Sequence, residues 1–324
     1  MLSVYTPAPL GLKRLDRAAD APLPEEAIWL DLLEPTVDEE RLVEARLGVE
    51  VPTREEMREI ESSSRLYEED GALYLTATIV TKLDTALPEN AQVTFILKGP
   101  RLVTNRYTDP LPFRRFIAYA ERHPATCSSA PALLAGLLES IVNRIADVIE
   151  RVGADMDISS AEVFSTPRKR HRNAPRDFRK VLERVGQSGE LIAKARESLV
   201  SLSRLLAFVQ QSTDPIPQDV RTRLRTLSKD VVAMSDHASF LGTNLNFILD
   251  ATLGMINIDQ NNILKIFSVV TVFLLPPSVI AGIFGMNFAH IPGLQETWGF
   301  GAAVALMVLS AVLPYLEFKR RGWL

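Results

Sequence analysis

The chain has 324 residues, with 36 basic and 40 acidic side chains and a formal net charge of −4. This balance excludes the overall positive charge that is typical of nucleic-acid-binding proteins. The single cysteine, Cys127, excludes an intramolecular disulfide and a zinc site built from cysteines. The amino terminus lacks a basic segment followed by a long apolar run, so we expect no cleavable signal peptide.

Residues 1–125 predict a domain that mixes strands and helices. β-Branched residues and alternating polarity favour strands over residues 27–33, 72–81, 92–98 and 101–107, the last two joined tightly at Gly99-Pro100. Two Thr-x-x-Glu pairs, at Thr36 and Thr53, are typical of capping boxes and predict that helices begin there.

Residues 126–262 predict a helical region. Helical periodicity covers residues 131–164 and 175–211, and the basic stretch 168–172 between them is expected to be a solvated loop or a contact with anionic lipid or an acidic partner. Between Pro217 and Pro276 there is no proline, which favours one continuous helix from Pro217 to Met286. About 70 residues at ~1.5 Å each give a rod on the order of 105 Å, most of it a stalk outside a membrane.

Residues 263–324 predict a transmembrane hairpin. The apolar runs 263–284 and 300–316 are close to the ~20 residues that cross a bilayer, and neither has the charged stripe expected of a buried core helix, which is the alternative. Lys265 lies in the first turn of the first run and three basic residues follow the second run, whereas the loop 288–299 has none. The positive-inside rule therefore predicts an inner-membrane protein with both termini and residues 1–260 in the cytoplasm.

One stripe of the long helix, at spacings of three, four or seven residues, mixes polar and apolar side chains. We call this stripe the seam, and it consists of Asp250, Asn257, Asn261, Leu264, Ser268, Thr271, Leu275, Ser278 and Gly282. A closed coiled coil would be almost wholly apolar at such positions. Polar groups at membrane depth tend to face water or a bundle interior, so several copies of this helix would line a narrow pore. The alternative is that the seam hydroxyls only bond their own backbone.

The motif Gly285-Met286-Asn287 directly follows the first apolar run. Together with the hairpin, residues 254–287 and the tail 314–324, this motif resembles the CorA family of magnesium and cobalt channels. Residues 28–83 resemble the family's cytoplasmic domain, so the resemblance covers essentially the whole chain. It implies an α+β cytoplasmic domain followed by a long stalk helix and two transmembrane helices, assembled as a funnel-shaped homopentamer in the lipid bilayer.

The resemblance also implies how ions pass. A ring of Gly285, Met286 and Asn287 would form the outer mouth, where neutral oxygens hydrogen-bond hydrated Mg²⁺ without stripping its waters. Asn287, Asn261 and Asp250 would be the metal-facing positions. Intracellular Mg²⁺ would be both cargo and regulator, bound between subunits by candidate acids at Glu55, Glu56, Glu59, Asp230 and Asp236. Flux would be driven by the membrane potential and would extend to Co²⁺ and possibly to Ni²⁺ as further divalent cations.

The outer loop departs from the family's pattern, since Ala289 and Gly293 stand where acidic residues are expected and Glu296 is the only acid. The Ile-Pro-Gly run is similar to that of the ZntB zinc transporters, and His290 could then ligate zinc. The alternative is therefore a Zn²⁺ transporter, possibly proton-coupled. A further alternative is a scaffold whose hairpin only anchors a soluble sensor. No phosphate-binding loop or nucleophile–base pattern occurs, so we expect no catalytic residue and no organic cofactor.

Overall fold

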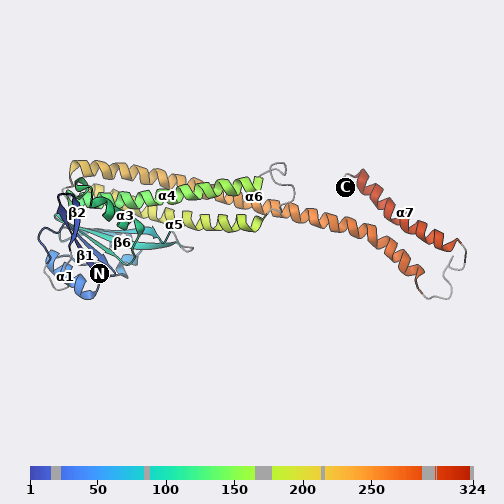
Figure 1. Ribbon diagram of the computed structural model, residues 1–324, viewed down its shortest axis with the longest axis horizontal. Coiled ribbons are helices and arrows are strands. Elements are labelled where there is room, and N and C mark those ends of the chain that lie inside the picture. Colours follow the sequence, from blue (N-terminus) through green and yellow to red (C-terminus); the bar gives the residue numbers. More distant parts are fainter. Residues whose placement is uncertain are drawn as a thin grey trace. The chain divides into compact units, whose positions relative to one another are not determined.

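The computed structural model describes residues 1–15, 23–83, 88–164, 177–212, 216–286, 296 and 298–321. They divide into two compact units, Met1–Leu249 and Asp250–Leu324. The helix α6 (Gln218–Phe284) belongs to both, so the predicted continuous helix is confirmed. The ribbon in Figure 1 shows the elements along the chain.

The first unit contains one sheet, with strand order β2-β1-β3-β7-β6-β5-β4 among the described residues. The strands are β1 (Leu2–Ala8), β2 (Gly11–Leu15), β3 (Trp29–Leu33), β4 (Leu66–Glu69), β5 (Ala72–Thr81), β6 (Glu89–Lys98) and β7 (Arg101–Arg106). Strands β3 and β7 pair in parallel, and the other neighbours pair antiparallel. The tight β6–β7 connection is confirmed, with Gly99 in the left-handed region at φ 56°.

All four predicted strands are present, but β1, β2 and β4 were not predicted. Strand β4 lies at the edge of the sheet. Its sequence, Leu-Tyr-Glu-Glu, lacks the alternation of apolar and polar residues that predicts a strand. Strand β1 ends in a proline and alanine stretch that indicates a turn more strongly than a strand. Pairing with neighbours, rather than local composition, stabilises these strands.

The two predicted capping boxes have different outcomes. Thr36 caps α1 (Val37–Leu47), and both reciprocal bonds with Glu39 are present. The same bonds join Thr53 and Glu56, at 2.8 and 3.4 Å, but they open only the single 3₁₀ turn η1 (Glu56–Arg58). The prediction of a helix there was wrong, because the chain after this turn offers no apolar face to bury: Ile60 is 89% exposed.

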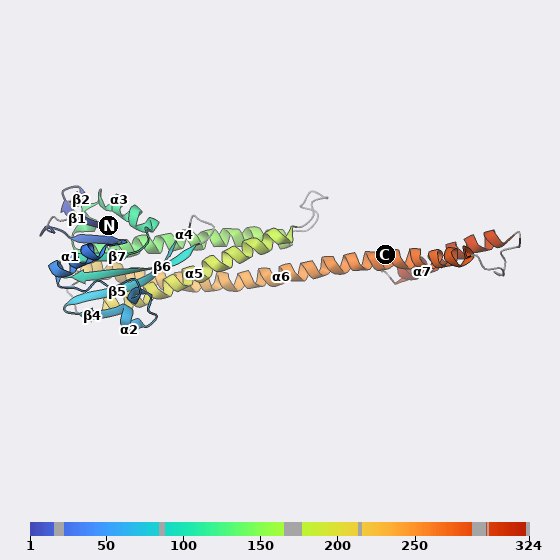
Figure 2. The same ribbon diagram turned by 90° about the horizontal axis from the view of Figure 1, so that it is seen from below.

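Long helices pack beside the sheet, as Figure 2 shows for α4 (Ala130–Phe164) and α5 (Phe178–Gln211). The backbone N–H of Thr78 in β5 donates to the Ser201 hydroxyl of α5 at 2.9 Å. The short helices α2 (Ser62–Arg65), α3 (Leu111–Ala120) and η2 (Pro124–Cys127) complete the unit. A Cβ on Gly136 of α4 would come within 2.4 Å of the Phe116 ring of α3, so this crossing requires glycine.

The part of α6 in the first unit buries one apolar stripe. Its buried members recur at spacings of three, four or seven residues: Val220, Leu224, Leu227, Val231, Ala238, Leu241, Leu245 and Ile248. Arg223 forms two hydrogen bonds with Glu139 of α4, at 3.0 and 2.7 Å. The other positions of this part of the helix are exposed or half-buried.

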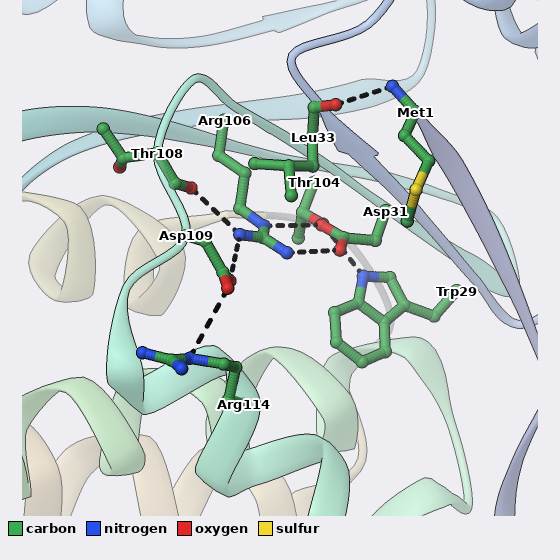
Figure 3. Close-up of polar contacts among 9 residues, drawn as sticks. All are labelled: Met1, Trp29, Asp31, Leu33, Thr104, Arg106, Thr108, Asp109 and Arg114. Carbon is green, nitrogen blue, oxygen red and sulfur yellow. Dashed lines mark hydrogen bonds and ion pairs between the residues drawn. The ribbon is translucent and has the colours of Figure 1, made fainter.

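A polar cluster joins β3 and β7 inside the sheet unit (Figure 3). Arg106 donates to both oxygens of Asp31, at 2.9 and 2.7 Å, and also to the carbonyl of Thr108 and the carboxylate of Asp109. The Thr104 hydroxyl donates to Asp31 at 2.6 Å. Burial by itself would lower the pKa of Arg106, but the bonds to Asp31 and Asp109 raise it overall.

Candidate functional site

Among the described residues, two helices are long and apolar enough to cross a membrane: α6 and α7 (Gly299–Arg320). In the most apolar 18-residue stretch of α6 no residue is buried, and in that of α7 only 11% are. Core helices of a soluble protein would be covered by their own chain. Here Phe267 is 66% exposed and Phe300 83% exposed, so lipid or other copies of the chain must cover this apolar surface.

One face of α6 packs towards α7. The rings of Phe273 and Tyr315 lie with centroids 5.9 Å apart. The half-buried positions of α6 in this region share that face, and they are Val269, Val272, Phe273, Pro276, Pro277, Ile280 and Phe284. The helix continues through the pair Pro276 and Pro277.

The seam lies on the other side of α6. All nine of its positions, from Asp250 to Gly282, are exposed in the chain. At about 100° per residue, the seam and the α7 side are separated by roughly 150° around the helix axis. Contacts among the described residues therefore leave the seam exposed from Asp250 to Gly282.

The seam hydroxyls donate hydrogen bonds to the helix backbone, which is the alternative to pore lining that the sequence left open. Ser268 donates to the carbonyl of Leu264 at 2.9 Å, Thr271 to that of Phe267 at 2.9 Å, and Ser278 to that of Leu274 at 2.6 Å. Each hydroxyl hydrogen is thereby used, while the oxygen keeps lone pairs that can accept from another donor. A water bound to a cation is such a donor, so these bonds fix the oxygens as acceptors without excluding a pore-lining role.

The motif after the first span begins where the helix ends. Gly285 still donates to the carbonyl of Ala281 at 2.9 Å, and Met286 donates to that of Ile283 at 3.3 Å. A Cβ on Gly285 would come within 3.1 Å of the Ala281 carbonyl, so glycine eases this ending. Met286 is 47% exposed. Asn287 lies outside the described residues, as do Ala289, His290 and Gly293 of the loop.

The candidate regulatory acids lie in two separate places. Glu55, Glu56 and Glu59 lie at η1, where Glu56 is engaged with Thr53. Asp230 and Asp236 are exposed on α6. No hydrogen bond or ion pair joins the two groups in the described part of the chain, and no three His, Cys, Asp or Glu side chains there are arranged to hold a metal. The basic stretch 168–172 lies outside the described residues.

Two cavities of the first unit with charged residues in their walls were not predicted from the sequence. One, of about 480 Å³, has several glutamates in its wall, and it adds Glu50, Glu68 and Glu69 to Glu56 and Glu59. The other, of about 570 Å³, is lined by three arginines. Both combine residues of different elements, and the local density of charged residues in 50–69 is a sequence signal for the first cavity alone.

The chain matches known proteins over nearly its whole length. A family model described as CorA-like Mg²⁺ transporter protein matches residues 24–320. The magnesium transport protein CorA of Escherichia coli (strain K12) is 32% identical over 324 residues, which cover 100% of both chains. The protein of the same name from Haemophilus ducreyi is 32% identical over 299 residues, 92% of each chain.

Solved structures share the fold at lower identity. The complete CorA magnesium transporter of Methanocaldococcus jannaschii has a TM-score of 0.75 and 18% identity, and covers 100% of this chain and 99% of that one. The full-length CmaX protein has a TM-score of 0.69 and 17% identity, covering 99% and 97%. The ZntB cytoplasmic domain of Vibrio parahaemolyticus has a TM-score of 0.58 and 11% identity, covering 80% and 98%.

Proposed function

The chain belongs to the CorA-like Mg²⁺ transporter family, and on this premise we propose that it is a divalent-cation channel whose main ion is Mg²⁺. The observation that carries the proposal is the polar seam of α6, because none of the residues that the structure describes covers it. A funnel-shaped homopentamer in the inner membrane would turn the five seams toward one axis. Both termini and the first unit would then lie in the cytoplasm.

The outer mouth would be a ring of the Gly285-Met286-Asn287 motif. Mg²⁺ gives up its water reluctantly, so neutral carbonyl oxygens of Gly285 and Asn287 would contact the hydrated ion. Neutral contacts hold the ion weakly enough for release, which conduction requires. Met286 would pack beneath the ring rather than contact the ion.

Below the mouth, the ion would pass the seam. The hydroxyl oxygens of Ser268, Thr271 and Ser278 would accept hydrogen bonds from the ion's water shell, because their own hydrogens are committed to the backbone. Leu264 and Leu275 would form apolar collars. Asn261 would form a second ring, and five copies of Asp250 would concentrate cations at the inner end.

The driving force would be the membrane potential. A doubly charged ion that crosses about 100 mV gains about 4.6 kcal/mol, twice the value for a single charge. Co²⁺, and to a lesser extent Ni²⁺, would follow the same path, since they carry the same charge and also hold a shell of water.

Intracellular Mg²⁺ would also control the channel. Asp230 and Asp236 are exposed on α6, so a neighbouring subunit could bring Glu55, Glu56 or Glu59 against them. Facing carboxylates repel, and a bound divalent ion would offset that repulsion and hold the closed arrangement. Loss of the ion would loosen the interface and favour opening.

The second candidate is a Zn²⁺ transporter of the ZntB type. The Ile-Pro-Gly run of the outer loop favours it, because that run is similar to that of the ZntB zinc transporters. The magnesium transport names of the relatives at 32% identity favour the first candidate. A membrane-anchored scaffold, in contrast, would transport no ion.

Ion flux into liposomes that contain the purified protein distinguishes these functions. Under an inside-negative potential without a proton gradient, we expect Mg²⁺ entry that Co²⁺ inhibits. Zinc entry that follows an imposed proton gradient, with little Mg²⁺ entry, would establish the second candidate instead. Absence of any flux from a correctly assembled oligomer would overturn both transport functions.

A further inference from the structure

A cavity of about 570 Å³ in the first unit has an unbalanced positive wall. Its floor is formed by β5, and its sides are formed by α5 and by the segment that leads into β4. Arg65, Arg196 and Arg204 line it, and Glu197 is the only carboxylate among its lining residues. Three positive charges against one negative charge leave an excess of two positive charges around one opening.

The local contacts hold two of these charged side chains in place. The Glu197 carboxylate already accepts a hydrogen bond from the Asn90 side chain at 2.6 Å. Arg65 is fixed at the cavity wall, because it donates to the Thr78 hydroxyl at 3.1 Å and to the carbonyl of Glu59. Burial lowers the pKa of Arg65, and Arg204 lowers it further while Glu197 opposes this. The wall therefore repels additional cations and favours an anion.

The remaining lining residues indicate the size and chemistry of that anion. A volume of this order is typical of small-molecule sites. The planar guanidinium fork matches phosphate oxygens in pairs, which favours a phosphate group over a simple halide. Ile60, which is 89% exposed, and Val200, which is 45% exposed, form an apolar part of the wall that a nonpolar portion of the ligand would cover.

From these features we infer that this cavity is a binding site for a soluble organic phosphate that carries at least two negative charges, such as a nucleoside diphosphate or triphosphate. Arg65, Arg196 and Arg204 would contact the phosphates, and Ile60, Leu66 and Val200 the less polar part. A lipid phosphodiester carries one negative charge and would leave half of the excess positive charge unmatched. The inference does not depend on the transport proposal, since the binding involves neither the pore nor the ion that passes through it.

Equilibrium dialysis of the full-length protein in detergent, with radiolabelled ATP and excess chelator to remove divalent cations, tests this site. We expect saturable binding, and a dissociation constant about tenfold higher in Arg196→Gln and in Arg204→Gln, because each variant removes charge-assisted hydrogen bonds to phosphate. Arg179→Gln is the matched control: it removes the same charge from an exposed position of α5 whose partner is Glu183, outside the cavity. This control should bind ATP as the unaltered protein does.

Several results would overturn the inference. Absence of saturable binding by the unaltered protein would do so, and so would equal weakening in all three variants, which would indicate general attraction to a basic surface. Dissociation of the oligomer in the two cavity variants would show that the arginines bind an acidic neighbour instead. Binding to phosphatidylglycerol vesicles that the same variants lose, without ATP binding, would assign the phosphate to lipid.

Discussion

Arg106 and Asp31 are hydrogen-bonded to each other twice, although 75 residues separate them in the chain. Their side chains are 4% and 3% exposed, and they belong to β7 and β3, which pair in parallel. Parallel strands need a long connection, so this ion pair joins the two ends of a crossover that contains β4, β5 and β6. Removing Asp31 would leave the buried Arg106 with only the partly exposed Asp109 as a counter-charge.

We therefore expect Asp31→Asn to lower the free energy of unfolding by about 3–5 kcal/mol. Circular dichroism of the full-length protein during thermal or denaturant unfolding measures this change. Asp109→Asn is the matched control, because Asp109 also pairs with Arg106 but is 43% exposed, and its loss should cost less than about 1 kcal/mol. Equal losses in the two variants would contradict the role assigned to burial.

The reactivity of Cys127 should depend on folding and on pH. Its thiol is 3% exposed and donates to the carbonyl of Ala120, and burial raises its pKa to about 11. At pH 8 the folded protein should therefore react slowly with iodoacetamide, because the thiolate is the nucleophile, whereas the protein in guanidinium should react completely. Mass spectrometry of the alkylated chain measures both rates, and rapid labelling of the folded protein would show that the site is open.

The same shift makes stability depend on pH in the alkaline range. The folded pKa lies above the unfolded value of about 8.5, so folding favours the neutral thiol. That contribution is fully present below about pH 8.5 and is lost as the pH rises through about 11. The difference in unfolding midpoint between the unaltered protein and Cys127→Ala should therefore shrink across this window.

The seam hydroxyls can be tested with substitutions that keep their shape. If the oxygen of Thr271 accepts from a hydrated ion, Thr271→Val should reduce Mg²⁺ flux several-fold, and Ser278→Leu should block it by filling the lumen. Val270→Leu is the control, since Val270 is exposed next to the seam but does not belong to it. Unchanged flux in Thr271→Val would mean that the hydroxyl only bonds the Phe267 carbonyl.

The proposed outer mouth depends on the side-chain carbonyl of Asn287. We expect Asn287→Ala to reduce Mg²⁺ flux to the background of empty liposomes, while the oligomer still assembles, as measured by its mass in detergent. Asn262→Ala makes the same change on α6, outside the seam, and should conduct normally. Full transport by the Asn287 variant would refute the proposed mouth.

The proposed sensor predicts altered inhibition by internal Mg²⁺. The double variant Asp230→Asn, Asp236→Asn should conduct several-fold more than the unaltered protein at millimolar internal Mg²⁺, because the carboxylates that hold the closed arrangement are gone. Asp219→Asn, at the start of the same helix, serves as the control. If inhibition in the double variant equals that of the unaltered protein, these two aspartates do not sense the ion.

The long helix and the apolar hairpin could be predicted from the sequence because their causes are local. An uninterrupted helical pattern from Pro217 onward becomes α6, and two apolar runs become the exposed parts of α6 and α7. Strands with strong β-branched content were predicted for the same reason. The Thr53–Glu56 pair shows the limit of local reasoning, since both its hydrogen bonds form and yet only one 3₁₀ turn follows.

The sequence by itself determined the two apolar runs that can span a membrane, the helical stalk and the family to which the chain belongs. Only the tertiary structure decided that the seam lies away from α7, that Arg106 meets Asp31, and that Arg65 shares a cavity with Arg196. The physical reason is distance along the chain. Helix periodicity and hydropathy act among neighbouring residues, whereas the pairing of charges and the filling of cavities depend on which distant segments pack together.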